Sequence, residues 1–267
     1  MLDYPVGIAI KEIINENANV KTFVLDAQLD ARPGQFIMAW VPRIDEKPFS
    51  LSRISGNIAI TVQRKGKTTE KMHEMRAGEI LGIRGPYGNG FDVSKAKSAC
   101  IVAGGIGVAP LIPLAEALQN PKFILGARTK NDLLFEERLK KCSELYITTD
   151  DGSAGKKGFN TQALERLLNE GKKFDSVFCC GPEPMMKRVF EICENHKIPL
   201  QASLERFMKC GGLGICGQCS VNGIRVCADG PVFGNEMLKK MLEFGNLARL
   251  KTGRKVPLKE YAEWRQK

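Results

Sequence analysis

Short runs of β-branched and aromatic residues recur along the first 95 residues, with turn-forming residues between them. The clearest runs are Ile8–Ile10, Lys21–Leu25, Gln35–Val41 and Asn57–Val62. Regularly spaced short strands are typical of a small β-barrel or sandwich. The pattern therefore predicts a β domain over residues 1–95, which a glycine-rich loop at Gly85–Gly90 closes.

The pattern changes near residue 98, where buried-strand runs begin to alternate with helical stretches. Strands are expected at Ala99–Ala103, Lys122–Ala127, Leu145–Thr149 and Ser176–Cys180, and helices at Leu111–Gln119, Leu133–Lys141, Thr161–Asn169 and Pro184–Asn195. This alternation indicates βαβ units and an α/β doubly wound parallel sheet over residues 96–200. It stops near Gln201, where a small cysteine-rich segment (201–233) and a tail (234–267) follow.

Composition and charge narrow the class of protein. The chain has 267 residues, of which 43% are hydrophobic and 26% charged, and this excludes a disordered or fibrous chain. The net charge of +10 fits a nucleic acid partner, an anionic surface or a cleft for phosphate-bearing cofactors. Residues 236–267 hold nine Lys or Arg and four Asp or Glu, so half of this excess lies in the tail, where a solvated helix or a subunit contact is expected.

The sequence pattern predicts neither a secretion signal nor a membrane span. Its start, Met1-Leu2-Asp3-Tyr4-Pro5, lacks a basic region followed by an apolar core. The longest apolar stretch, residues 99–115, contains three glycines and two prolines and is shorter than the roughly 20 residues that a span needs. We therefore expect a cytoplasmic protein with reduced cysteines.

Four of the nine cysteines lie close together in the chain. Cys210, Cys216, Cys219 and Cys227 have the spacing C-x5-C-x2-C-x7-C, with glycines between them. A structural zinc ribbon offers two C-x2-C pairs, whereas the plant-type [2Fe–2S] pattern is C-x4-C-x2-C with a distant fourth cysteine. The spacing favours a [2Fe–2S] cluster, with one extra residue in the first gap, and leaves zinc as the alternative. The other five cysteines are expected to be packing residues: Cys100, Cys142, Cys179, Cys180 and Cys193.

Two glycine turns follow expected strands of the parallel sheet. The first, Gly104 to Pro110, follows a strand and opens a helix, where a pyrophosphate binds favourably. It lacks the third glycine and the later acid of the dehydrogenase fingerprint, and a tight turn without a ligand is the alternative. The second turn runs from Cys180 to Met185. Because ligands sit at the carboxyl ends of such strands, we expect the two turns to bracket one dinucleotide.

These features together resemble the ferredoxin reductase-like flavoprotein superfamily over residues 1 to about 233. Lys47-Pro48-Phe49-Ser50 is similar to its Arg-x-aromatic-Ser flavin motif, with Lys in place of Arg. The resemblance implies that Lys47 faces the FAD phosphates, Phe49 stacks near the isoalloxazine and Ser50 lies near its reactive nitrogen. The remaining FAD contacts that it implies are the main chain of Thr61, Val62 and Gln63 and the turn of Gly66, Lys67 and Thr68.

The same resemblance assigns the nicotinamide nucleotide to the two glycine turns. The residues implied are Gly104, Gly105, Gly107, Pro110, Cys180, Gly181, Pro182 and Met185. Arg128, which follows the second strand of the sheet, is compatible with a 2′-phosphate, a pyrophosphate or a surface position. The resemblance favours NAD over NADP.

The cysteine segment narrows the resemblance to one subfamily. Glu205–Cys210 and Cys227–Phe233 resemble the electron-transfer subunit of NAD-linked, B-type dihydroorotate dehydrogenase. This implies an oxidoreductase subunit of pyrimidine biosynthesis that passes electrons from an FMN-containing catalytic subunit, through [2Fe–2S] and FAD, to NAD⁺. A heterotetramer, with no nucleic acid partner, is implied as well. The alternatives are a sulfhydrogenase or sulfite reductase subunit and, more remotely, a zinc-containing nucleic-acid-binding protein.

Electron counting gives a separate argument for FAD. A nicotinamide exchanges two electrons as a hydride, whereas an iron–sulfur cluster exchanges one electron at a time. A chain that holds both groups therefore needs a flavin between them. No catalytic side chain is expected, because the cofactors carry the chemistry and the protein positions them.

Overall fold

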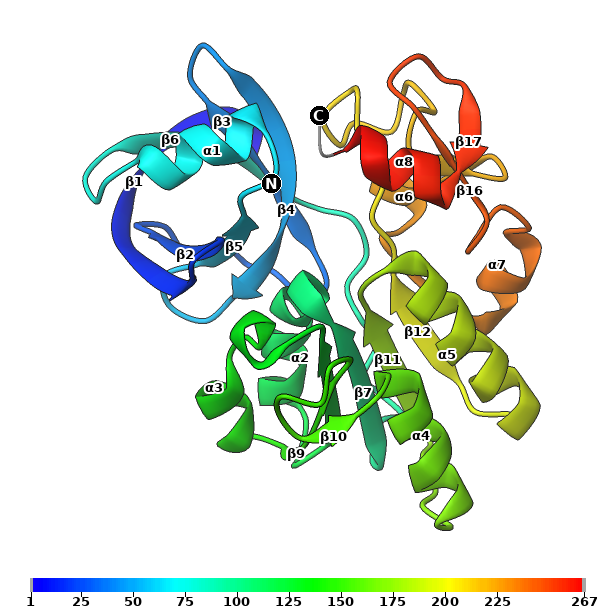
Figure 1. Cartoon of the computed structure of the whole chain (residues 1–267). Helices are drawn as coiled ribbons and strands as arrows, with labels where there is room; N and C mark the ends of the chain where they lie inside the picture. The colour runs from blue at the N-terminus through cyan, green and yellow to red at the C-terminus, as the bar shows by residue number, and fades with distance from the viewer. Residues whose placement is uncertain (1, 266–267) are drawn as a thin grey trace.

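The computed structural model describes residues 2–265. Figure 1 shows three parts: an N-terminal barrel, a central sheet covered by helices, and a C-terminal part made of short strands, helices and loops. Both predicted folds, the β-barrel and the doubly wound sheet, are confirmed.

The barrel is closed, with the strand order β1-β2-β5-β4-β3-β6, and neighbouring strands are antiparallel. Its elements are β1 (Leu2–Asn17), β2 (Val20–Leu25), β3 (Phe36–Val41), β4 (Asp45–Arg53), β5 (Ala59–Gln63), α1 (Lys67–Glu74) and β6 (Ile80–Tyr87). Closure leaves no exposed sheet edge. Inward-facing residues such as Phe23, Ile37 and Ile60 fill the interior, and Met72 of α1 joins them.

Two barrel strands differ from the sequence prediction. The pattern does not predict β4, because charged residues and a proline occupy its first half. The expected closing loop is partly wrong as well, since Gly85–Tyr87 form the end of β6. β4 lies between β5 and β3, which were both predicted, and β6 lies between β3 and β1. Closure of the barrel supplies the pairing that local propensity does not.

The central sheet has seven strands in the order β10-β9-β8-β7-β11-β12-β15. All neighbours are parallel except β12 and β15. The strands are β7 (Ala99–Gly104), β8 (Lys122–Ala127), β9 (Glu144–Thr149), β10 (Lys156–Lys157), β11 (Ser176–Cys180), β12 (Leu200–Ser203) and β15 (Val232–Gly234). The chain moves outward from β7 in one direction through β10 and then returns to add β11 on the other side. The switch point between β7 and β11 is where ligands of such sheets bind.

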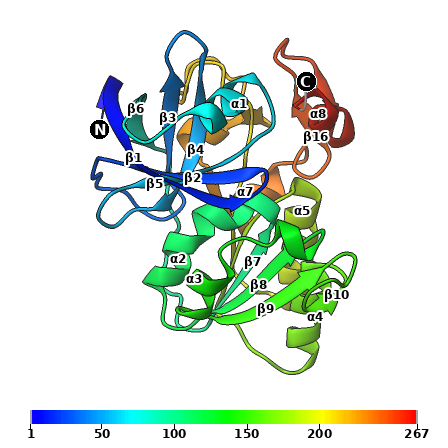
Figure 2. The same ribbon diagram turned by 60° about the vertical axis from the view of Figure 1, so that its left-hand side comes forward.

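Helices cover both faces of the sheet (Figure 2). They are η1 (Gly105–Leu111), α2 (Ile112–Ala117), η2 (Lys130–Asp132), α3 (Glu136–Lys140), α4 (Asn160–Asn169) and α5 (Glu183–His196). Ile101 and Phe123 face the side of α2 and α3, whereas Val102 and Ile124 face the side of α4 and α5. The expected helix after the first glycine turn thus begins as a 3₁₀ turn.

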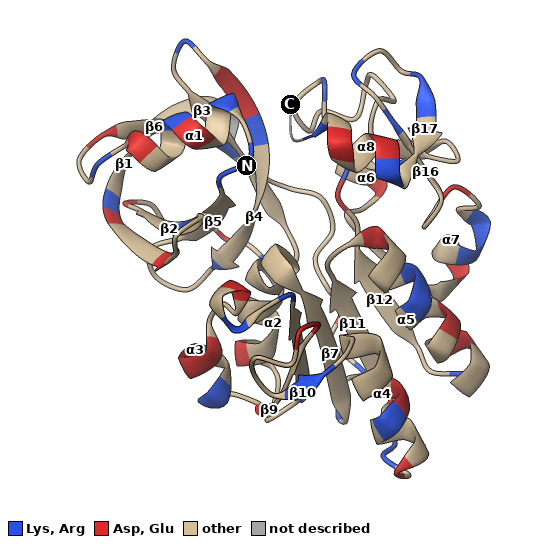
Figure 3. Cartoon of the chain, viewed as in Figure 1, with Lys and Arg blue, Asp and Glu red and all other residues tan. Residues whose placement is uncertain are grey.

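The cysteine-rich segment and the tail are folded onto this sheet. Their elements are β13 (Ser220–Val221), β14 (Ile224–Arg225), α6 (Val226–Asp229), α7 (Asn235–Lys240), β16 (Leu247–Arg249), β17 (Lys255–Pro257) and α8 (Leu258–Trp264). The alternation expected to stop at Gln201 continues, because β12 pairs with β11, and β15 adds an edge strand. The tail is not a solvated helix: Phe244 is fully buried in the core beside α5. Figure 3 shows basic residues on β17 and α7.

Within residues 2–265, no helix is both long enough and apolar enough to cross a membrane.

Candidate cofactor sites

The two glycine turns contact each other at the switch point of the sheet. A Cβ atom on Gly107 would lie 2.5 Å from the carbonyl oxygen of Cys180, and one on Gly104 would lie 2.6 Å from the sulfur of Met185. Gly181 has φ +157° and its added Cβ would lie 3.0 Å from the backbone of Gly104. The absence of side chains therefore allows both turns to meet, and it leaves backbone exposed where β7 and β11 end.

The other predicted nucleotide residues lie around this contact. Gly105 has φ +53° and open space where its side chain would be, whereas Pro110 is buried in η1 and Pro182 caps α5. Arg128 is exposed just beyond the end of β8. Asn160 was not predicted from the sequence, because its role depends on the sheet. Its amide donates to the carbonyl of Ala103 (2.8 Å) and to the Met185 sulfur (2.9 Å), so it holds the second turn against the end of β7.

The predicted flavin residues lie on two neighbouring parts of the barrel. Lys47, Phe49 and Ser50 are successive half-buried positions of β4, and Lys47 pairs with Asp45. On β5, the Val62 side chain is fully buried and the Thr61 hydroxyl donates to the Ser52 hydroxyl (2.8 Å). Thr61 and Val62 thus offer a ligand their main chain rather than their side chains, whereas Gln63 is half-buried.

The turn of Gly66, Lys67 and Thr68 forms the N-terminus of α1. Gly66 is the residue before the helix, and no side chain caps the first turn. The Thr69 hydroxyl accepts the N–H groups of Lys65 and Gly66, which fixes the entry into the helix. An uncapped helix N-terminus next to lysine side chains suits a diphosphate.

The four predicted cluster cysteines lie in one loop region and form two pairs. The sulfurs of Cys219 and Cys227 are 3.3 Å apart, and the thiol of Cys210 interacts with that of Cys216. Among residues 2–265, no three or more His, Cys, Asp or Glu side chains are gathered for a single metal ion. Two pairs match a binuclear cluster, in which each iron takes two protein ligands, better than one tetrahedral zinc ion.

Hydrogen bonds to the sulfurs of Cys210 and Cys219 favour the ionised forms of these two cysteines. Burial raises the pKa of Cys210, but hydrogen bonds from the backbone of Cys216, Ile215 and Gly214 outweigh it and lower the pKa to about 7. The thiol of Cys227 lowers the pKa of Cys219 to about 6, and the same interaction raises the pKa of Cys227. Metal ligands must be thiolates, so the loop is suited to hold a cluster.

The cysteine loop contacts the barrel directly at Gly211, where there is no room for a side chain. A Cβ on Gly211 would lie 2.0 Å from Nη2 of Arg84 and 2.6 Å from Oε2 of Glu46. Arg84 and Glu46 form a two-pronged ion pair, and Arg84 also donates to the Tyr87 hydroxyl (3.0 Å). The hydrogen bonds that Arg84 donates to Glu46 raise the pKa of Arg84. Because Glu46 precedes Lys47 on β4, the loop contacts the strand that carries the predicted flavin motif.

A second buried ion pair joins the nucleotide turn to the cysteine segment and the tail. Arg206 and Glu183 are 3% and 8% exposed and pair through both guanidinium nitrogens. Arg206 also donates to the carbonyl of Leu247, and Glu183 accepts the N–H of Gly245 (2.7 Å). Neither residue was predicted, since nothing in the local sequence indicates that these segments meet.

The other five cysteines are buried or half-buried, and none forms a disulfide. Cys100, Cys179 and Cys193 belong to one hydrophobic cluster, which fits the packing role expected of them. Burial raises the pKa of Cys193 and of Cys180 to about 12. Such thiols are not ligands or nucleophiles at neutral pH.

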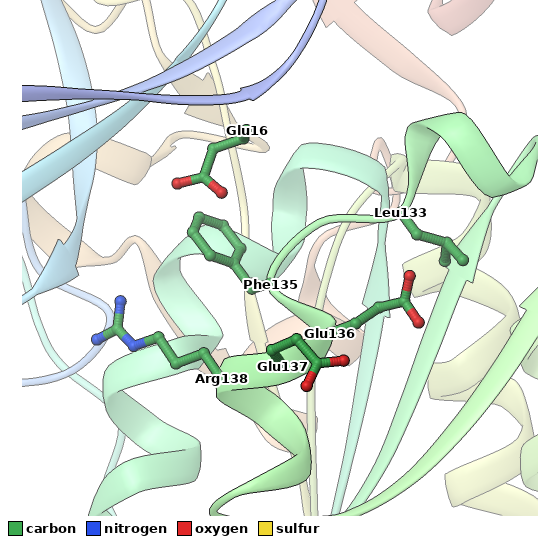
Figure 4. A pocket seen from close by; sticks show the side chains of 6 residues that line it. All are labelled: Glu16, Leu133, Phe135, Glu136, Glu137 and Arg138. Atoms are coloured by element: carbon green, nitrogen blue, oxygen red, sulfur yellow. The ribbon is translucent and has the colours of Figure 1, made fainter.

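One shallow pocket of about 370 Å³ lies away from all of these residues. It is formed where the end of β1 meets α3, and the ring of Phe135 points toward Glu16 in it (Figure 4). Three carboxylates line it: Glu16, Glu136 and Glu137. It contains none of the predicted site residues.

The structure combines three features: a barrel with a flavin-type strand, a sheet with two facing glycine turns, and a four-cysteine loop. Together they define a flavin- and nicotinamide-dependent oxidoreductase with an iron–sulfur segment. Residues 5–91 match the oxidoreductase FAD-binding domain family, and residues 101–191 match the oxidoreductase NAD-binding domain family. Residues 205–239 match the iron–sulfur cluster binding domain of dihydroorotate dehydrogenase B. The chain therefore has FAD, NAD and iron–sulfur cluster binding domains.

Relatives match nearly the whole chain. A protein of Methanocaldococcus jannaschii is 50% identical over 96% of this chain and 99% of its own, and one of Methanothermobacter thermautotrophicus is 44% identical over 96% and 98%. Each carries the name "Probable dihydroorotate dehydrogenase B (NAD(+)), electron transfer subunit". This chain belongs to the family of dihydroorotate dehydrogenase B electron transfer subunits.

Solved structures agree with the fold. The structure described as an NADH-dependent reduced ferredoxin-NADP oxidoreductase superposes with a TM-score of 0.77 at 31% identity, over 88% of this chain and 92% of that one. The ferredoxin reductase of carbazole 1,9a-dioxygenase gives a TM-score of 0.62 at 18% identity, over 73% of this chain and 66% of that one, and shows the fold alone.

Proposed function

We propose that this chain is the electron-transfer subunit that passes electrons from dihydroorotate, oxidised on a partner catalytic subunit, to NAD⁺ in pyrimidine biosynthesis. The observation that carries the proposal is the contact between the cysteine loop and β4, through Gly211 and Glu46. It brings the predicted cluster and flavin residues onto neighbouring surfaces, with the nucleotide turns at the adjoining end of the sheet. The family matches favour this function over a sulfhydrogenase or sulfite reductase subunit.

We assign the site residues to three cofactors: the [2Fe–2S] cluster, FAD and NAD. Cys210, Cys216, Cys219 and Cys227 hold the [2Fe–2S] cluster. Lys47 and the N-terminus of α1 bind the FAD diphosphate, Phe49 and Ser50 orient the flavin ring, and the β5 main chain supports it. The two glycine turns bind NAD, and Arg128 reaches its phosphates. When bound, the cluster carries single electrons and FAD exchanges them for the hydride that NAD⁺ accepts.

The partner is an FMN-containing catalytic subunit, and the complex is a heterotetramer in the cytoplasm. Leu213 and Ile215 of the cysteine loop are 54% and 79% exposed, and Cys216, which follows Ile215, is exposed too. Apolar side chains that are left exposed around a redox centre suit a protein partner. We place the contact with the catalytic subunit on this face. The five cysteines outside the cluster loop form no disulfide, which fits a reducing compartment.

The experiment replaces one cluster ligand in the reconstituted complex. Cys216→Ser should abolish dihydroorotate-dependent reduction of NAD⁺, because the connection between the subunits is lost. NADH-dependent reduction of a dye, which needs only FAD and the nucleotide turns, should remain close to native. Cys142→Ser, at a half-buried cysteine outside the loop, is the control and should retain both activities.

Equal loss of both activities in Cys216→Ser, with flavin still bound, would contradict the proposed order of cofactors. An absorption spectrum of the native protein without flavin or cluster bands would contradict the cofactors themselves.

A further inference from the structure

The end of the tail is attached to the residues that lead into the first cluster cysteine. The Tyr261 hydroxyl of α8 accepts the N–H of Phe207 (2.9 Å), and the rings of Trp264 and Phe207 meet edge to face at 5.5 Å. Arg265 pairs with Glu205 at 2.5 Å. The C-terminal end of α8 points toward the barrel and α1 (Figure 1). These contacts bring the last described residues of the chain to the side that faces the predicted flavin site.

The predicted flavin residues reach the same place from the barrel. The Nζ atom of Lys47 lies 5.7 Å from the centre of the Phe207 ring, so Phe207 lies between Lys47 and Trp264. Lys65, next to the α1 turn, is close enough to Glu205 and Arg265 for their charges to alter its pKa. Loss of surrounding water is the main cause that lowers the pKa of Lys65, and Arg265 lowers it further.

Positive charge exceeds negative charge around this point. Lys47 pairs with Asp45 and Arg265 with Glu205, but within residues 2–265 neither Lys65 nor Arg128 has an ion pair. Arg128 also contributes to the lowered pKa of Lys65, so cations of the barrel, the sheet and the tail act on one another here. A diphosphate would supply the missing negative charge.

We propose that the tail is part of the flavin site and that Arg265 is a ligand of the FAD diphosphate. This rests on the proposed function. A guanidinium has five N–H donors in a planar fork that matches phosphate oxygens, and only one of its nitrogens, Nη2, is used by Glu205. Glu205 is then a positioning residue, which holds the fork toward the α1 turn. The lysine that replaces the motif arginine at position 47 cannot form such a fork, and Arg265 provides it from the other end of the chain.

The tail is held in place without Arg265. The Gln218 amide donates to the carbonyl of Leu250 (2.7 Å), and Asn222 and Glu243 exchange two hydrogen bonds through their backbone N–H groups. Ala248, Val256 and Tyr261 form a small hydrophobic cluster of their own. A substitution at Arg265 should therefore alter ligand binding and leave the fold intact.

The test measures FAD affinity of the full chain after reversible removal of its flavin, by the change in flavin fluorescence on titration. Arg265→Gln should raise the Kd for FAD about tenfold, the size expected from one charge-assisted phosphate contact. Arg265→Lys keeps the charge and should lie between Arg265→Gln and native. Arg254→Gln is the matched control, because Arg254 lies in the same unit and pairs with the exposed side of α8 through Glu260. It should bind FAD as the native chain does.

A Kd of Arg265→Gln within twofold of the native value would overturn the proposal, and so would equal weakening in Arg254→Gln, which would indicate a general effect of the tail. A rise in the Kd for NAD with unchanged FAD affinity would overturn it too. If the native chain itself binds no FAD, the proposed function fails and not only the role of Arg265.

Discussion

At the scale of single residues, the cysteine spacing was informative because metal ligands must lie close in space, and a short loop guarantees this. The sequence does not indicate what the loop rests on. The Arg84–Glu46 pair joins β6 to β4, and its position under Gly211 exists only once the barrel has closed. Long-range contacts of this kind leave no local pattern, and the same is true of Asn160 and of Arg206 with Glu183.

Gly211→Ala tests the contact between the cysteine loop and the Arg84–Glu46 pair. Gly211 has φ +60°, and an added Cβ would also overlap the Arg84 guanidinium. We expect it to lower the free energy of unfolding by about 2 kcal/mol more than a control glycine substitution, since overlap is added to backbone strain. Gly223→Ala is that control, because Gly223 has φ +85° but nothing within 4 Å of its added Cβ. Urea unfolding and iron content of both variants check it. Equal losses of unfolding free energy in the two variants would contradict this expectation, because they would show that the Arg84–Glu46 pair moves aside without cost.

At the scale of elements, the hydrophobic pattern predicted most strands and helices of the sheet, because strands such as β7 are buried on both faces and helices such as α4 bury one face. It did not predict β4, whose half-buried positions carry Lys47 and Glu46. A strand that presents polar residues to a ligand has a weak hydrophobic pattern, so the same feature that hides β4 fits a functional role. The pattern also missed β12, since a strand of only four residues gives little signal.

Gly107→Ala tests the contact between the two glycine turns. The added Cβ would lie 2.5 Å from the Cys180 carbonyl oxygen, so the turns must separate. We expect the KM for NADH in dye reduction to rise about tenfold or more, because small displacements of a binding site are costly. Gly234→Ala, on the edge strand of the same sheet, is the control, since its nearest contact would be an ordinary 3.7 Å. An unchanged KM in Gly107→Ala, with native FAD content, would contradict the assignment of these turns to NAD.

At the scale of the whole molecule, the order of parts along the chain was predicted, but their connections were not. The tail is tied to the cysteine segment through Gln218, Asn222 and Phe207, whereas its basic composition predicted a solvated helix or a subunit contact. The basic residues of the tail up to Arg265 therefore belong to a folded unit beside the cluster loop. We expect the partner on the loop itself, whose aliphatic side chains Leu213 and Ile215 are exposed beside the cluster cysteines.

Ile215→Glu tests that face. Ile215 is 79% exposed, so a carboxylate there should not disturb the fold, but it would be buried without a counter-charge in an interface with the catalytic subunit. We expect the affinity for that subunit to fall by at least about tenfold, measured by titration of the purified subunits. Leu242→Glu is a matched control, because Leu242 is equally exposed at 77% but follows α7 in the tail. Iron and flavin contents should stay native in both variants. If Ile215→Glu binds as tightly as native while Leu242→Glu does not, the partner covers the tail and the electrons must enter by another route.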